Sequence, residues 1–197
     1  MQIIGGEFKG RKLFSLPGRS IRPTSGKVRE AVFNICAPMV AGARVADLFA
    51  GTGAMGIEAL SRGAAHAVFV ESDRGAADVI QKNLAACRAE NRSAVFCKNL
   101  LGNPGFLQQS GLVFDLVFMD PPYNRDTVAP ALENLVKSGV LAPGAVAVIE
   151  HAPAEPLPEN SALFEVFDQR KYGKTLVSFM KYMIASRESG TQDGMPA

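Results

Sequence analysis

Four consecutive residues after an apolar run have groups suited to holding an amine. Residues 116–119 are apolar and are followed by Asp120, Pro121, Pro122 and Tyr123. The Asp120 carboxylate and the Pro121 carbonyl can each accept one N–H, and the fixed φ of proline keeps that carbonyl in place. Tyr123 can stack on a base, a contact worth roughly 1–3 kcal/mol. The motif predicts a clamp that aims the lone pair of a conjugated amine at a methyl donor; a proline-rich turn with a buried tyrosine is the alternative.

A glycine-rich stretch, DLFAGTGAMG, follows an earlier apolar run. Gly51, Gly53 and Gly56 match the GxGxxG spacing of dinucleotide-binding folds. However, Asp47 precedes this loop, and a carboxylate there would repel a pyrophosphate but attract the ammonium group of a ligand. Glu71 can accept hydrogen bonds from both hydroxyls of a ribose. The set favours S-adenosylmethionine over a dinucleotide, and a tight turn that needs glycine only for packing is the bland alternative.

Both motifs must be positioned by the alternating strands and helices that the pattern predicts from residue 44 onward. Strands are expected at residues 44–49, 66–71, 94–99, 114–120 and 145–150. Helices are expected at residues 54–63, 73–90 and 126–139. The strands are apolar on both faces, which is typical of a parallel sheet covered by helices. Ligands bind at the carboxyl ends of such strands, so the clamp and the glycine loop are expected to share one crevice.

The two ends of the chain depart from this alternation. Residues 2–16 have short apolar pairs broken by glycines and predict a small hairpin with basic residues on its exposed side. A helix is predicted from Ser25 to Ala37, ending before Pro38. Residues 163–183 predict two antiparallel strands with a turn near residues 172–174, and residues 185–197 predict a disordered tail. We expect an N-terminal unit over residues 1–40 and a main domain over residues 41–184.

Positive charge is concentrated in the N-terminal segment. Residues 1–30 have seven basic and two acidic side chains, whereas the rest of the chain has 14 basic and 17 acidic ones. A basic segment on a slightly acidic body predicts a localised contact with a polyanion such as a nucleic acid. Ordinary solvated charges are the alternative.

The sequence resembles the bacterial RsmD-type family over about residues 1–182. The resemblance includes IIGGEFKGRKL, IRPTS, KVREAVFNI, DLFAGTGAMGIEALSRGA, DLVFMDPPY, LAPGAVAVIEH and KYGKT. It implies an α/β class I methyltransferase fold, Rossmann-like, with a seven-stranded sheet, a reversed last strand and a small N-terminal hairpin and helix. It also implies methyl transfer from S-adenosylmethionine to the N2 amine of one guanine in 16S rRNA of the small ribosomal subunit.

The resemblance also implies roles for individual residues. The clamp, Asp120 to Tyr123, matches the catalytic motif. The cofactor residues implied are Asp47, Phe49, Ala50, Gly51, Thr52, Gly53, Glu71, Ser72, Asn99 and Leu100. The RNA-contacting residues implied are Lys9, Arg11, Lys12, Arg22, Thr24, Ser25 and Arg29. Asn99 stands where similar proteins have an aspartate that accepts from the adenine amine, so we expect a weaker hydrogen bond there and modestly lower cofactor affinity.

Three other classes of protein would share some of these features. The clamp would also suit a DNA adenine-N6 methyltransferase, but the chain has no long insertion for reading a duplex. A protein glutamine methyltransferase would more typically have asparagine at Asp120. A non-catalytic ribosome assembly factor would not need the intact clamp.

Composition argues for a cytoplasmic monomer without a membrane span, export signal or metal. The three cysteines are widely spaced, which predicts reduced buried thiols, and the two histidines are far apart.

Overall fold

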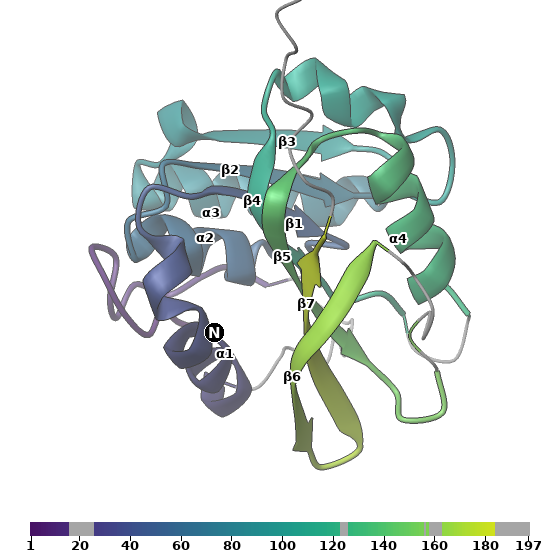
Figure 1. Cartoon of the computed structure of the whole chain (residues 1–197). Coiled ribbons are helices and arrows are strands. Elements are labelled where there is room, and N and C mark those ends of the chain that lie inside the picture. The colour runs from purple at the N-terminus through teal and green to yellow at the C-terminus, as the bar shows by residue number, and fades with distance from the viewer. Residues whose placement is uncertain (16–25, 123–125, 156, 158–162, 184–197) are drawn as a thin grey trace, which may run out of the picture.

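One seven-stranded sheet forms the centre of the molecule (Figure 1). The computed structural model describes residues 1–15, 26–122, 126–155, 157 and 163–183. The strands are β1 (Arg44–Leu48), β2 (His66–Glu71), β3 (Ser93–Cys97), β4 (Phe114–Met119), β5 (Leu141–His151), β6 (Phe164–Tyr172) and β7 (Thr175–Tyr182). The order across the sheet is β3-β2-β1-β4-β5-β7-β6. Strands β1 to β5 pair in parallel, and β7 is antiparallel to both β5 and β6. The predicted α/β sheet with a reversed last strand is therefore confirmed.

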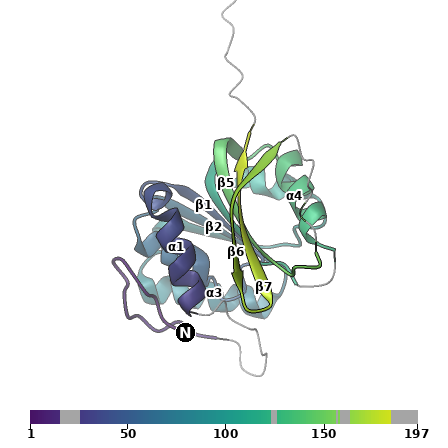
Figure 2. The ribbon, with the colours of Figure 1, turned by 60° about the horizontal axis from the view of Figure 1, so that its bottom comes forward.

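Helices cover both faces of the sheet. Helices α1 (Gly26–Val40), α2 (Ala54–Ser61) and α3 (Arg74–Cys87) lie on one side, and α4 (Val128–Lys137) lies on the other, as Figure 2 shows for α1, α3 and α4. Two apolar clusters result, one beneath each layer. All but the first residue of β1 are buried, because helices cover both of its faces, whereas β3 at the sheet edge is half-exposed.

Local sequence explains where α3 begins and ends. The Asp73 side chain accepts a hydrogen bond from the Ala76 N–H at 2.9 Å and so caps the N-terminus of the helix. The helix ends at Cys87 rather than near Glu90, because Arg88 adopts a left-handed conformation with φ of 54°. A short 3-10 helix (η1, Glu90–Arg92) follows.

The structure departs from the predicted elements in three further respects. The first helix does not stop before Pro38 but continues to Val40. Proline has no N–H, so Pro38 cannot donate the usual helical hydrogen bond to the Asn34 carbonyl. Both residues are exposed, so water can donate to that carbonyl instead. Strand β5 is longer than predicted at both ends, and its pairing with β4 shifts register between Phe114 and Leu116. The 3-10 helix η2 (Pro104–Ser110) was not predicted.

The N-terminal segment packs into the same core as the sheet. Ile3, Phe8 and Leu13 are buried in one cluster with residues of α1, α2 and β1. An antiparallel bridge joins Gln2 to Lys12, which supports the predicted hairpin. The tail at residues 185–197 lies outside the described residues.

Within the described ranges, no helix is long and apolar enough to cross a membrane. Cys36 and Cys87 are buried, but Cys97 is exposed at the end of edge strand β3, contrary to the expectation of three buried thiols.

Candidate active site

The glycine loop makes a tight turn between β1 and α2. Phe49, Gly51 and Gly53 have φ values of 59°, 56° and 77°. Positive φ is uncommon for a residue with a side chain, so Phe49 is held in a conformation that is often found at binding sites. The Ala50 N–H donates to the Val70 carbonyl at 3.0 Å, which ties the loop to β2. A Cβ added at Gly51 would meet nothing within 4 Å, so the loop has open space beside it.

Asp47 lies at the start of this turn and is almost fully buried. Its Oδ2 accepts a hydrogen bond from the Gly56 N–H at 2.8 Å. A carboxylate near a helix N-terminus is favourable, so this contact secures the first turn of α2. Burial raises the pKa of the Asp47 carboxyl to about 7. The hydrogen bond from the Gly56 N–H lowers this pKa, and the nearby charge of Glu71 raises it further. Asp47 therefore has a structural task in addition to the predicted one.

Glu71 holds the loop from the end of β2. Its Oε2 accepts from the Gly51 N–H at 2.9 Å, and its Oε1 accepts from the Asp73 N–H at 2.9 Å. The side chain is half-exposed. Since two carboxylate oxygens offer about four acceptor positions, Glu71 can still accept from ribose hydroxyls.

We expect Gly56→Ala to destabilise the protein. A Cβ there would lie 2.4 Å from Cε1 of Phe69 and 3.2 Å from Cβ of Asp47. Phe69 is fully buried and cannot move aside, so the free energy of unfolding should fall by about 1–3 kcal/mol in a denaturant titration. The matched control is Gly26→Ala, where an added Cβ meets nothing within 4 Å. Equal stability of the two variants would contradict the close packing of α2 on β2.

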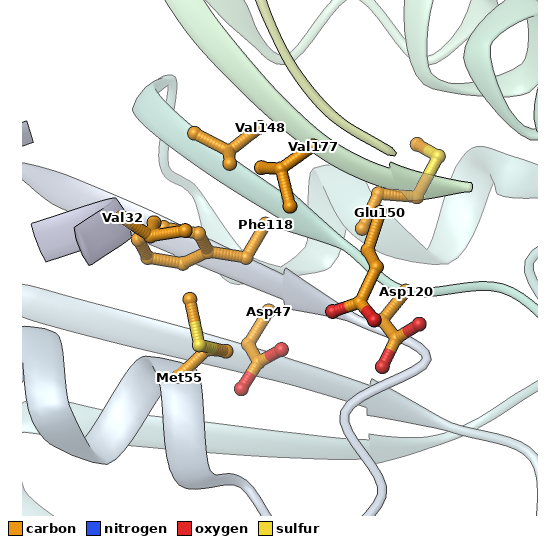
Figure 3. A pocket seen from close by; sticks show the side chains of 9 residues that line it. Val32, Asp47, Met55, Phe118, Asp120, Val148, Glu150 and Val177 are labelled. Atoms are coloured by element: carbon orange, nitrogen blue, oxygen red, sulfur yellow. The ribbon is translucent and has the colours of Figure 1, made fainter. Parts of the chain in front are cut away.

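Asp120 of the clamp and Asp47, which precedes the glycine loop, line one recess at the carboxyl edge of the sheet. Strand β4 lies beside β1, with Asp47 paired to Phe118. The recess is lined by Val32, Asp47, Met55, Phe118, Met119, Asp120, Val148, Glu150 and Val177. Figure 3 shows the carboxyl groups of Asp47, Asp120 and Glu150 around this space. Asp120 thus shares a recess with Asp47, whereas residues 49–53 of the glycine loop do not line it, so the crevice expected for the clamp and the glycine loop stays a prediction. Glu150 is a further lining residue that no sequence pattern indicated.

The segment that follows the clamp is held by Glu155, a buried residue in the loop after β5. Oε1 of Glu155 accepts from the Thr127 N–H at 3.0 Å, and the Thr127 hydroxyl donates to the Pro122 carbonyl at 3.4 Å. The ring of His151 is hydrogen-bonded through Nδ1 to the Glu155 carbonyl at 3.0 Å. Pro121 is buried. This support comes from residues 28 positions away from Thr127 in the sequence, so no local pattern could have indicated it.

Asn99 and Leu100 lie beyond the end of β3. Asn99 is exposed, and its Oδ1 accepts from the Leu101 N–H at 3.0 Å, whereas Leu100 is buried. The Lys98 N–H donates to the Glu71 carbonyl at 3.0 Å, which brings this segment next to the end of β2. Ser72 is also exposed there. A second recess is lined by Lys98, Asn99, Asn103, Gly105, Phe106 and Gln109.

The predicted RNA-contacting residues divide into three groups. Lys9, Arg11 and Lys12 are exposed on the N-terminal segment. Arg29 is only 1% exposed, and its Nη2 donates to the Gln2 carbonyl at 2.5 Å, so the prediction that it contacts RNA is wrong. Arg29 is spaced so that it shares the buried face of α1 with Val32, Phe33 and Cys36, and this helical spacing could have indicated its burial from the sequence. Arg22, Thr24 and Ser25, together with Tyr123 of the clamp, lie outside the described residues.

Asn83 connects the N-terminal segment to the glycine loop. This fully buried residue of α3 accepts from the Phe14 N–H through Oδ1 at 2.7 Å. Its Nδ2 donates to the Thr52 carbonyl at 2.9 Å and to the Phe14 carbonyl at 3.2 Å. The basic segment is thus anchored directly beside the loop that follows β1.

Among the described residues, no three His, Cys, Asp or Glu side chains are grouped so as to hold a metal ion.

Comparison with known proteins agrees with this arrangement. The family model described as Conserved hypothetical protein 95 matches residues 1–181. Ribosomal RNA small subunit methyltransferase D of Escherichia coli K12 is 35% identical over 189 residues, covering 96% of this chain and 91% of that protein. The protein of the same name from Haemophilus influenzae is 35% identical over 171 residues, covering 84% and 86%. The solved E. coli structure yhhF has a TM-score of 0.82 and 36% identity, covering 93% of this chain and 98% of that one. The chain therefore belongs to the Conserved hypothetical protein 95 family, the RsmD family.

Proposed function

We propose that this protein transfers a methyl group from S-adenosylmethionine to the exocyclic N2 amine of a guanine in 16S rRNA, in the assembled small ribosomal subunit. The observation that carries this proposal is the recess that Asp120 of the amine clamp lines together with Asp47, a residue of the strand that leads into the glycine loop. The names of the relatives support rRNA of the small subunit as the substrate. The proposal includes action as a monomer in the cytoplasm.

The loop residues fit S-adenosylmethionine. This cofactor would supply an electrophilic methyl group on a sulfonium, together with a ribose and an ammonium group. Asp47 and Glu71 offer carboxylates, and neither oxygen pair is exhausted by the contacts to Gly56 and Gly51. The open space beside Gly51 leaves room for a ligand to approach the backbone closely. Ser72, Asn99 and Leu100, near the end of β2, are the residues that we assign to the adenine.

The clamp residues would orient the amine and manage its proton. Asp120 accepts one N–H, and the carbonyl of Pro121 accepts the other, so that the nitrogen lone pair is directed out of the base plane. Asp120 is also the acceptor for the proton that the nitrogen must lose. The ring of Tyr123 would stack on the base. Catalysis then depends mainly on positioning and on the negative charge near the reacting nitrogen.

We expect S-adenosylmethionine to bind more tightly as the pH rises through about 7. The pKa of Asp47 is raised to about 7 by burial, so below this pH the carboxyl is mostly neutral. A cationic ligand favours the ionised carboxylate, and its dissociation constant should therefore fall with rising pH and level off above the pKa. Titration calorimetry at pH values from about 1.5 units below to about 1.5 units above this pKa would measure the effect. The same slope in Asp47→Asn would assign the titration to another group.

We expect charge reversal at Arg11 and Lys12 to weaken RNA binding. Both side chains are exposed on a segment whose end, Phe14, is anchored to the glycine loop through Asn83. If both neutralise phosphates, the slope of log affinity against log salt should become less steep by about one per lost contact. Charge reversal at Lys137, which is exposed on α4 across the sheet, is the control. An unchanged slope in the double variant would mean that this segment does not contact phosphate.

The decisive experiment is a tritium-transfer assay from labelled S-adenosylmethionine. The substrates are small ribosomal subunits from a strain lacking this gene, the matching naked rRNA, and duplex DNA. Label recovered as N2-methylguanosine is the expected result, with subunits a better substrate than naked RNA. Label in DNA adenine would replace the proposed substrate, and no label despite cofactor binding would favour an assembly factor.

A further inference from the structure

Glu150 stands beside the clamp in the register of the sheet. Met119 of β4 pairs with Ile149 of β5, so the next residues, Asp120 and Glu150, are neighbours on adjacent parallel strands. Adjacent strands lie about 4.8 Å apart. Side chains alternate between the two faces of a sheet, so Asp120 and Glu150 share the face of Phe118 and Val148. Figure 3 shows their carboxyl groups side by side in the recess.

Two adjacent carboxyl groups match the hydrogen-bonding edge of guanine. Guanine presents its N2 amine next to the N1–H, so two neighbouring positions are donors. Adenine presents its N6 amine next to an unprotonated N1, which is an acceptor. An ionised carboxylate can only accept, so it would attract guanine N1–H and repel adenine N1. A base extruded into a pocket is read along this edge.

We propose that Glu150 is the specificity-determining residue that accepts the N1–H of the target guanine while Asp120 accepts from the N2 amine. This inference rests on the proposed function and extends it to the choice of base. Glu150 already has an interaction within the protein, but its two oxygens provide about four acceptor positions, which leaves capacity for the base. The Glu150 side chain is longer than that of Asp120 by one methylene, which suits contact with the neighbouring ring nitrogen.

The test replaces the base rather than only the protein. Small subunits are reconstituted with rRNA that has guanine, 2-aminopurine or 6-thioguanine at the nucleotide labelled in the transfer assay. 2-Aminopurine keeps the N2 amine but has an acceptor at N1, and 6-thioguanine keeps both donors and alters only position 6. Values of kcat/KM are measured for the wild type, for Glu150→Gln and for the control Glu165→Gln, whose carboxyl is exposed on β6.

The wild type should prefer guanine over 2-aminopurine by at least about 100-fold and accept 6-thioguanine. In Glu150→Gln the preference over 2-aminopurine should fall at least about tenfold, because the amide can donate to an acceptor at N1. Glu165→Gln should keep the wild-type preference, and cofactor affinity should be equal in all three proteins. If the wild type methylates guanine but Glu150→Gln keeps the same preference for guanine over 2-aminopurine, the role of Glu150 is overturned and the proposed function stands. A wild type that does not methylate guanine would overturn the proposed function.

Discussion

Replacing Asp120 with alanine is expected to lower the single-turnover rate of methyl transfer by about 10²–10³-fold, while S-adenosylmethionine affinity stays within about threefold. Asp120 follows Met119 at the end of β4 and lines the recess with Asp47. Its proposed contact is to the amine and not to the cofactor, so the loss should appear in the chemical step. The rate is measured with enzyme in excess over subunits and with saturating cofactor.

A graded series separates this role from general damage to the fold. Asp120→Asn keeps an acceptor but removes the charge, so its rate should lie between those of the wild type and the alanine variant. Glu133→Gln removes an exposed carboxylate on α4 and should leave the rate unchanged. If Asp120→Ala retains full turnover, Asp120 does not hold the amine and the clamp hypothesis fails.

The sequence predicts those features that depend on local pattern. The runs that became β1, β2 and β4 are short and apolar, and only a sheet covered on both faces buries such runs. The glycines at positive φ in the loop, Gly51 and Gly53, have the conformational freedom that the turn requires. The shared recess then follows from topology, because the carboxyl ends of adjacent parallel strands lie at one edge.

Contacts between distant segments could not be predicted in this way. Asn83 and Glu155 join segments 69 and 28 residues apart, and a single polar residue on a helix or in a loop has no pattern that names its partner. Glu150 was missed for a related reason, since it lies near the end of an apolar strand and becomes significant only when β5 is known to lie beside β4. Arg29 was included among the RNA-contacting residues, although its helical spacing with Val32 and Phe33 already indicated the buried face of α1.

Replacing Glu58 with alanine is expected to destabilise the protein more than Gly56→Ala does. Glu58 of α2 is fully buried, and its carboxylate accepts from the Ile4 N–H at 2.9 Å and from the Gly5 N–H at 2.8 Å. The carboxylate also accepts a hydrogen bond from Nε of Arg62 at 2.8 Å and forms an ion pair with Nε of Arg29 at 3.5 Å. Removal leaves the buried guanidinium of Arg29 without its counter-charge, which costs roughly 3–5 kcal/mol. The melting temperature should fall by roughly 6–20 °C.

Two comparisons test whether the buried charge causes this loss. Glu133→Ala also removes a carboxylate from a helix, but the ion pair of Glu133 with Lys137, at 3.3 Å, is exposed. The free energy of unfolding should therefore fall by less than about 1 kcal/mol. The double variant Arg29→Met with Glu58→Met removes both charges and should be more stable than Glu58→Met alone, because no unpaired charge is then buried. If the double variant is as unstable as the single one, the loss comes from the N–H groups of Ile4 and Gly5 instead. In that case Glu58 serves chiefly to fasten the basic N-terminal segment to the helix that begins at the glycine loop.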